Sequence, residues 1–161
     1  MEIERQFLID KLPHLPIDYE TILQGYVALL PEIRIRQTGY DNFTLTVKRG
    51  AGLVRDEWEK AISRQEFESL AERLQPGTRM IKKRRYRLPL ENGLVAEIHV
   101  HDGHLAGFSY VEVEFDTIED AAAFGPPKWF GREVTDDARF SYGALAQVDG
   151  MEIVRQMIDI S

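Results

Sequence analysis

The sequence predicts an α+β fold around an antiparallel sheet, and the charges on its strands favour closing that sheet into a barrel. Three observations support this prediction. Many short stretches alternate between polar and apolar residues, as strands do, because strand side chains point to opposite faces in turn. A few other stretches show helical spacing with recognisable caps. The polar faces of the strands carry mainly Arg, Lys and Glu.

The first part of the chain alternates in five stretches. The sequence TGYDN between two of them is typical of a turn, because Gly39 tolerates a positive φ and Asp41 and Asn42 favour local hydrogen bonds. The two stretches around this turn therefore form a predicted hairpin. The five predicted strands are 2–9, 24–29, 32–37, 43–48 and 54–62.

The rest of the chain mixes helices with further strands. Ser63 and Glu66 have the spacing of a capping box, so a helix begins there and ends at Pro76. Thr117 caps a second, short helix that runs through Phe124. The stretches 82–88 and 94–100 form a second predicted hairpin, 110–115 is another strand, and 138–148 and 151–158 are expected to be helical.

Composition narrows the class of protein. The length of 161 residues and the hydrophobic content of 43% fit one domain over 1–161 with a substantial core. No apolar run approaches the ~20 residues of a membrane span, and the absence of cysteine excludes disulfides and thiolate metal ligands. A net charge of −7 disfavours general binding to nucleic acid, because phosphate backbones require an excess of basic surface. The first residues do not resemble a secretory signal, so we expect a cytoplasmic protein without a membrane partner.

Charged side chains share a face on one predicted strand after another. An open sheet with one solvated face would explain each strand alone. The dominance of Arg, Lys and Glu favours instead a barrel with a charged lumen and an apolar outer face covered by helices. A barrel of about eight strands has room for one small ligand. The residues on the charged faces are Glu2, Glu4, Arg34, Arg36, Lys48, Arg55, Glu57, Glu59, Lys83, Arg85, Arg87, Glu97, Glu112 and Glu114.

Such a lumen suits phosphate chemistry. Arg and Lys bind phosphoryl oxygens, and Arg can bind them with two hydrogen bonds. Carboxylates would repel the same ligand unless a cation lies between them, and Mg²⁺ and Mn²⁺ prefer carboxylate oxygen. Paired Glu-x-Glu motifs opposite basic strands therefore predict a metal-binding site that faces a phosphate-binding site.

The ordered set of these motifs resembles the CYTH, or triphosphate tunnel metalloenzyme, superfamily over essentially the whole chain. The motifs are Glu2-Ile-Glu4, Arg34-Ile-Arg36, Thr46-Val-Lys48, Arg55 with Glu57-x-Glu59, Lys83-x-Arg85-Tyr86, Glu112-Val-Glu114-Phe115 and Gly131-Arg-Glu-Val-Thr-Asp136. The resemblance implies an eight-stranded antiparallel tunnel with flanking helices, a divalent metal (Mg²⁺ or Mn²⁺) and hydrolysis or cyclisation of a substrate that carries a triphosphate. The activities that the resemblance implies as candidates are inorganic tripolyphosphatase, thiamine triphosphatase and class IV adenylate cyclase.

The same resemblance implies roles for individual residues. Glu2, Glu4, Glu112 and Glu114 look like metal carboxylates, and Glu57 and Glu59 look like supporting acids. Arg34, Arg36, Lys48, Arg55, Lys83, Arg85 and Arg139 look like phosphate contacts, and Glu4, Tyr26, Arg55 and Lys83 form the expected catalytic set.

Three positions depart from the pattern of the superfamily. Gln6 stands where the opening motif Glu-x-Glu-x-Lys has its lysine, and an amide can supply neither a cation nor a titratable amine. His99 stands where many relatives have an acid, and Tyr142 where an Asn is common. A zinc site built from His99, His101 and His104 is the weaker interpretation of these histidines, because His104 falls in a turn.

We therefore expect metal-dependent hydrolysis of a triphosphate, with inorganic tripolyphosphate favoured because no pocket for a nucleotide base is evident. A class IV adenylate cyclase is an alternative. A binding protein for polyphosphate or nucleotide, weakened in catalysis because Gln6 replaces the lysine, is another. The expected partner is a small triphosphate, and a homodimer is left open.

Overall fold

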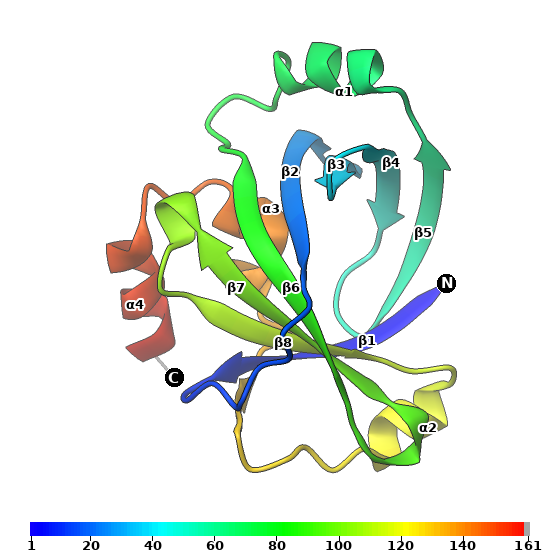
Figure 1. Ribbon diagram of the computed structural model, residues 1–161, viewed down its shortest axis with the longest axis vertical. Coiled ribbons are helices and arrows are strands. Elements are labelled where there is room, and N and C mark those ends of the chain that lie inside the picture. Colours follow the sequence, from blue (N-terminus) through cyan, green and yellow to red (C-terminus); the bar gives the residue numbers. More distant parts are fainter. Residues whose placement is uncertain (160–161) are drawn as a thin grey trace.

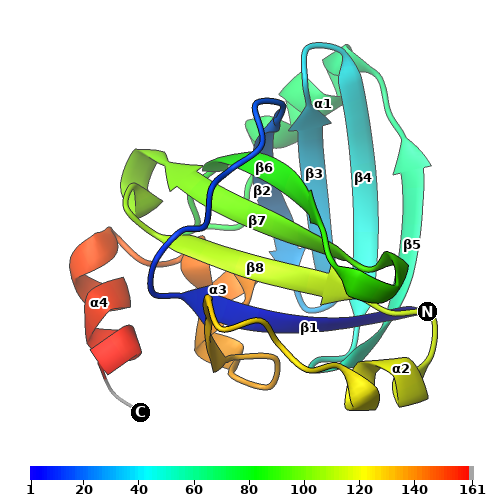
Figure 2. The ribbon, with the colours of Figure 1, turned by 60° about the horizontal axis from the view of Figure 1, so that its bottom comes forward.

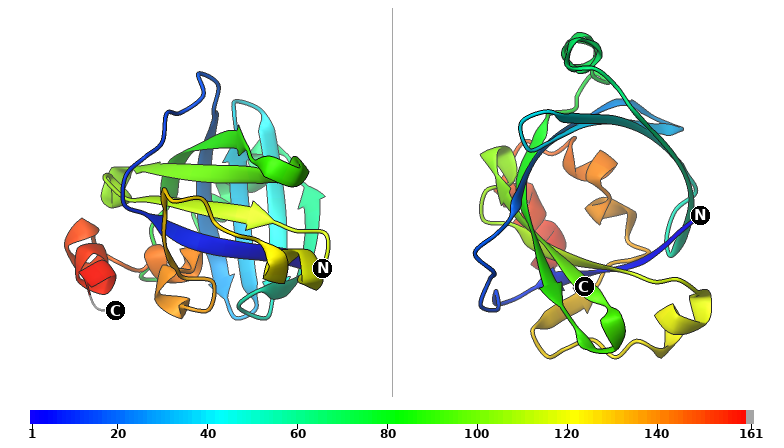
Figure 3. Two further views of the ribbon diagram at one scale, coloured as in Figure 1. Left: turned by 90° about the horizontal axis from the view of Figure 1, so that it is seen from below. Right: turned by 45° about the vertical axis from the view of Figure 1, so that its right-hand side comes forward.

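Eight strands form a closed antiparallel ring in the computed structural model, which describes residues 1–159 (Figure 1; Figure 3, right). Neighbours in the ring follow the order β5, β4, β3, β2, β6, β7, β8 and β1. The ring closes where β1 pairs with β5, with Glu2 opposite Arg55 and Ile3 opposite Val54. The expectation of a closed eight-stranded antiparallel barrel is therefore confirmed.

The ring strands match the predicted alternating stretches closely. They are β1 (Glu2–Ile9), β2 (Glu20–Leu29), β3 (Glu32–Thr38), β4 (Asn42–Arg49), β5 (Val54–Ala61), β6 (Ile81–Pro89), β7 (Val95–Asp102) and β8 (Ser109–Glu114). The predicted hairpin turn at Gly39 lies between β3 and β4, and Gly39 has the positive φ of 66° that the turn requires. The second strand begins four residues before the predicted start. The prediction missed these residues because they do not alternate strictly between polar and apolar.

A ninth strand lies outside the ring. β9 (Phe130–Glu133) pairs with β1, with Phe7 opposite Glu133 and Ile9 opposite Phe130. The sequence does not predict it, since four residues after two prolines are too few to show a period of two.

Helices cover parts of the outer face and one end of the ring (Figure 2). The first, α1 (Arg64–Ala71), has the predicted capping box between Ser63 and Glu66. Its Phe67 packs on Ile35 and Phe43, which face outward from β3 and β4. The others are α2 (Ile118–Ala123), which is capped by Thr117 as predicted, α3 (Tyr142–Leu145) and α4 (Met151–Asp159).

The expected continuous helix over 138–148 is wrong. Residues Ala138–Phe140 form a single 3-10 turn, and the chain is extended at Ser141, with φ −65° and ψ 150°. The Ser141 hydroxyl then accepts a hydrogen bond from the backbone N–H of Ala144 and so begins α3 as a separate helix. This break directs Tyr142 toward the barrel interior. The expected helix over 151–158 is confirmed as α4.

Apolar side chains fill one end of the barrel. Inward positions near this end are Leu8, Tyr26 and Tyr110, and they pack in one cluster with Tyr142 and Leu145 of α3. The polar part of the lumen is therefore bounded on one side by this aromatic cluster. None of the helices within residues 1–159 is long and apolar enough to cross a membrane.

Candidate active site

The inward strand faces surround a cavity of about 860 Å³. Alternation along the strands places on this face the charged residues that the sequence assigns to the lumen. The cavity brings together all the predicted site residues except Arg139. They are Glu2, Glu4, Tyr26, Arg34, Arg36, Lys48, Arg55, Glu57, Glu59, Lys83, Arg85, Glu112 and Glu114.

Arg139 lies apart from this cavity. Its Nε and Nη2 atoms donate hydrogen bonds to the Asp137 carboxylate at 2.9 and 2.5 Å, and its side chain is 41% exposed. Asp137 lines the cavity, whereas Arg139 does not. Its phosphate contact therefore stays a prediction from the resemblance, without support from this geometry.

Carboxylates gather where β1 and β8 run side by side. Glu4 lies opposite Glu114, and Gln6 lies opposite Glu112. Inward side chains at such paired positions have Cβ atoms only about 5 Å apart, so like charges there repel each other. The Nε2 atom of Gln6 donates a hydrogen bond to Oε1 of Glu4 at 3.1 Å, and it brings no positive charge.

The acidity of these groups reflects their crowding. Burial and the charges of Glu112 and Glu2 raise the pKa of Glu4 to about 9. Burial and repulsion by Glu2 also raise the pKa of Glu114. Burial alone would raise the pKa of Glu2, but the attraction of Lys48, whose Nζ lies 3.0 Å from Oε1, lowers it. Near pH 7 Glu4 therefore keeps its proton, and a bound cation would have to displace that proton.

A hard divalent cation fits this donor set, because it binds carboxylate oxygens and would relieve their repulsion. As the side chains stand, no three carboxylate or imidazole groups within residues 1–159 are gathered around one point. Glu4 is engaged by Gln6, and Glu2 by Lys48, so a cation would have to replace these donors. Of the supporting acids, Glu57 has its pKa raised by burial and by Glu2, and Glu59 accepts a hydrogen bond from the Thr46 hydroxyl at 3.0 Å.

The basic side chains fall into two groups. One group is paired with carboxylates: Lys48 with Glu2 at 3.0 Å, Arg55 with Glu32 at 3.4 Å and Arg85 with Glu20 at 2.9 Å. The other group has neutral partners. Arg34 donates from Nη2 to the Thr46 hydroxyl at 3.3 Å, and Arg36 donates to the side-chain oxygen of Gln24. The positive charges of Arg34 and Arg36 are thus the ones most available to an anion.

Lys83 is a buried amine in the wall of the cavity. Its side chain is 1% exposed, and Nζ has no hydrogen-bond partner among the described residues. The amine lies 3.9 Å from the centre of the Tyr142 ring, on which it makes a cation–π contact when protonated. Burial and the charge of Arg36 hold the pKa of Lys83 well below its usual range. Nearby Tyr26 is fully buried, and burial raises its pKa.

His99 and His101 are buried in the barrel wall, whereas His104 lies half-buried in a 3-10 turn, and no zinc site forms from them within residues 1–159. The carbonyl of Phe108 can only accept, so His101 Nδ1–H donates to it at 2.9 Å, and Nε2 accepts from the Tyr142 hydroxyl at 3.0 Å. His99 Nε2 lies 3.6 Å from Glu112 Oε1. Burial lowers the pKa of His99 to about 4 and that of His101 to about 3, so both are neutral near pH 7.

The sequence analysis does not identify three residues that contact arginines of the cavity. Gln24, Glu20 and Glu32 hold Arg36, Arg85 and Arg55, respectively. Gln24 shares the inward face of β2 with Tyr26, so alternation alone could have identified it. The acids at the starts of β2 and β3 give no such signal, because strand ends commonly carry solvated charges.

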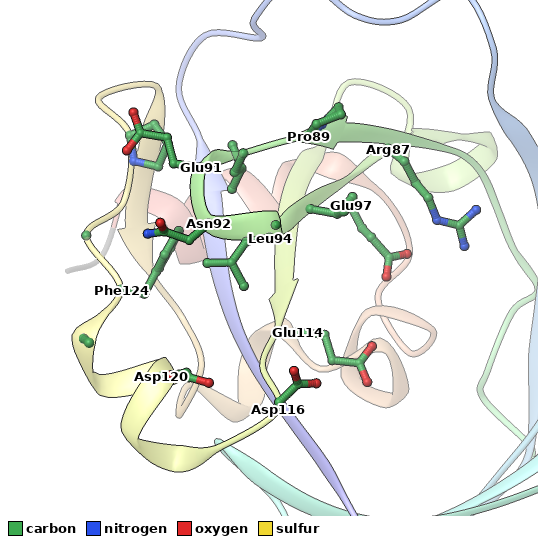
Figure 4. A pocket seen from close by; sticks show the side chains of 16 residues that line it. Arg87, Pro89, Glu91, Asn92, Leu94, Glu97, Glu114, Asp116, Asp120 and Phe124 are labelled. Carbon is green, nitrogen blue, oxygen red and sulfur yellow. The ribbon is translucent and has the colours of Figure 1, made fainter.

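A second cavity, of about 1240 Å³, lies outside the ring between the β6–β7 hairpin and α2 (Figure 4). Leu94 and Phe124 form apolar walls, and Asp116 and Asp120 lie along its lower edge (Figure 4). Three residues line both this cavity and the tunnel, namely Arg87, Glu97 and Glu114. The outer cavity therefore adjoins the acidic mouth of the tunnel.

Comparisons with known proteins identify the family of the chain. No family model matches the chain. An inorganic triphosphatase of Nitrosomonas europaea is 41% identical over 150 residues, which cover 90% of this chain and 96% of that protein. An inorganic triphosphatase of Acetivibrio thermocellus is 30% identical over 142 residues, which cover 86% of this chain and 88% of that protein.

A solved structure gives the same result. The crystal structure of an inorganic triphosphatase superposes with a TM-score of 0.69 at 37% identity, covering 93% of this chain and 97% of that one. Likeness of this extent in sequence and in fold, together with the charged tunnel, shows that the chain belongs to the inorganic triphosphatases of the CYTH, or triphosphate tunnel, superfamily.

Proposed function

We propose that this chain hydrolyses inorganic tripolyphosphate to pyrophosphate and phosphate. The observation that carries the proposal is the division of the cavity inside the ring into a carboxylate wall on β1 and β8 and a cationic wall on β3. A polyanion with charge along its whole length matches the second wall. The two relatives named above, both inorganic triphosphatases, support the choice of substrate.

Arg34 and Arg36 bind the inner phosphates in this account. Within residues 1–159 neither guanidinium forms an ion pair with a carboxylate, so their charge is available to phosphoryl oxygens. Lys48, Arg55 and Arg85 exchange their present carboxylate partners for substrate oxygens. Such exchange lets the substrate enter without leaving buried charges unpaired.

The superfamily is typically metal-dependent, and the carboxylate wall is the place where this chain would hold the metal. Mg²⁺ or Mn²⁺ bound by Glu2, Glu4, Glu112 and Glu114, supported by Glu57 and Glu59, would neutralise charge on the terminal phosphoryl group and orient water. Phosphoryl transfer depends mainly on such positioning and neutralisation.

Lys83 is the proposed proton acceptor. The oxygen of a water molecule forms a bond to the terminal phosphorus, and the bridging P–O bond breaks, so that pyrophosphate leaves with the bonding electron pair. The proton of the water passes to Nζ of Lys83, an amine whose pKa burial holds well below its usual range. Arg55 and Tyr26 complete the proposed catalytic set, since both line the cavity beside it.

The test is product analysis by phosphorus NMR with tripolyphosphate, ATP and pyrophosphate as separate substrates in the presence of Mg²⁺ or Mn²⁺. The proposal predicts equal amounts of phosphate and pyrophosphate from tripolyphosphate, and slower release from the other two substrates. Formation of cyclic AMP from ATP as the dominant reaction would support the cyclase alternative. Binding without turnover of any of the three would support the weakened binding protein.

A further inference from the structure

Gln24 is a fully buried amide that holds one arginine of the tunnel. It lies opposite Arg36 in the register of β2 and β3, and its side chain is 0% exposed. Its Oε1 atom accepts two hydrogen bonds from Arg36, one from Nε at 3.1 Å and one from Nη2 at 2.7 Å. Two donors on one acceptor fix the direction in which the guanidinium plane points.

The chemistry of the pair fixes the amide orientation. A guanidinium can only donate, so the oxygen of Gln24 must face it and the nitrogen must face away. That nitrogen, Nε2, is buried and has no hydrogen-bond partner among the described residues. A buried donor without a partner destabilises the fold, so the contact with Arg36 is kept at a cost in stability.

A neutral acceptor leaves the charge of the arginine intact, whereas a carboxylate would partly cancel it. Lys48, Arg55 and Arg85 are each paired with a glutamate, and those charges are partly cancelled. Gln24 orients Arg36 and cancels nothing. Arg36 therefore combines a fixed geometry with a full charge, the two properties that bidentate binding of a phosphoryl group requires.

We propose that Gln24 is a positioning residue, which aims the guanidinium of Arg36 at an inner phosphate of the substrate and leaves its charge intact. This inference rests on the proposed function, since it assumes that a polyphosphate enters the tunnel. Gln24 acts through Arg36 and need not touch the substrate.

The decisive variant is Gln24→Glu, which keeps the shape of the side chain and replaces the neutral acceptor with a carboxylate. We expect the KM for tripolyphosphate to rise about tenfold or more, with kcat changed less than about threefold, because binding of the inner phosphates is weakened before the chemical step. Calorimetric affinity for tripolyphosphate without metal should fall by the same factor. Gln37→Glu adds the same charge to the outward face of β3, where Gln37 bonds the Tyr40 carbonyl, and should match the wild type.

A double-mutant cycle separates positioning from a merely structural role. In an Arg36→Met background, Gln24→Glu should have no further effect on KM, because the group through which Gln24 acts is gone. Equal KM and metal-free affinity in Gln24→Glu and in an active wild type would overturn the inference and leave the proposed function standing. Full additivity of the two substitutions would overturn it as well. A wild type that neither binds nor hydrolyses tripolyphosphate would overturn both.

Discussion

The amide of Gln6 donates a hydrogen bond to the carboxylate of Glu4 across 3.1 Å, at the position where the superfamily motif has a lysine. The amide hydrogen bond occupies one oxygen of Glu4 and brings no positive charge. Burial and the charges of Glu112 and Glu2 raise the pKa of Glu4 to about 9 in this setting. Because Gln6 is neutral, the carboxylate wall has one positive charge fewer than it would have with a charged lysine at position 6.

Charge at position 6 should control the metal requirement. We predict that Gln6→Lys raises the metal concentration for half-maximal activity severalfold, because an ammonium beside Glu4 repels a divalent cation. Gln6→Glu should lower that concentration. Activity measured against Mg²⁺ and Mn²⁺ concentration checks both variants, and Gln37→Lys on the outer face serves as the control. Shifts of the same sign in the two variants would contradict the electrostatic explanation.

Lys83 should be needed for turnover but not for stability. Replacing it with methionine removes the proposed proton acceptor and should lower kcat by about 100-fold or more. The free energy of unfolding should not fall, because the substitution removes a buried amine that has no hydrogen-bond partner in the described chain.

Steady-state kinetics and denaturant unfolding test this pair of effects. Lys82→Met, on the exposed side of the same strand, is the matched control. A Lys83→Met chain that turns over at the wild-type rate would remove Lys83 from the mechanism.

Arginines with neutral partners should contribute more to substrate binding than arginines with acidic partners. Arg34 bonds the Thr46 hydroxyl, whereas Arg85 is paired with Glu20. We predict that Arg34→Met raises the KM for tripolyphosphate several times more than Arg85→Met does. Loss of Arg85 removes a charge that is already partly cancelled. Equal KM values in the two variants would show that the present ion pairs do not predict available charge.

Acid should destabilise the fold partly through His101. Burial and the neighbouring Lys83 amine lower the pKa of this histidine to about 3, against an ordinary value near 6.5. Between these values the unfolded chain binds a proton that the folded chain does not, so stability falls as pH falls, by up to about 1.4 kcal/mol per pH unit. The free energy of unfolding, measured with denaturant from pH 6.5 to 4, should depend on pH less steeply in His101→Gln than in the wild type. The difference in slope should equal the contribution of His101. An unchanged slope would mean that His101 is already protonated in the folded chain.

Much of the fold could be predicted from the sequence because alternation and capping are local signals. Ser63 and Glu66 specify their helix within four residues, and the turn at Gly39 requires a positive φ. β9 and the break at Ser141 could not be predicted in the same way. The strand depends on pairing with β1, which is distant in sequence, and the break depends on the burial of Tyr142 against His101.

The site shows the same division between local and distant information. Alternation identifies which side chains point inward, and the motif order supplies their proposed roles. Neither signal identifies which acid pairs with which base, because the partners are far apart in the sequence. Arg85 and Glu20 are 65 positions apart, and Lys48 and Glu2 are 46 positions apart. The distinction between compensated and uncompensated cations, on which the binding proposal depends, therefore appears only in three dimensions.

The most direct test of the central claim is phosphate release from tripolyphosphate by the unaltered chain, measured with Mg²⁺ or Mn²⁺ and again with a chelator. The account predicts metal-dependent turnover with Gln6 in place, because Lys83 and the arginines supply the groups that position 6 lacks. If the unaltered chain releases no phosphate with either metal, and Gln6→Lys restores turnover, the tunnel is intact but a cation at position 6 is required. That result would contradict the account.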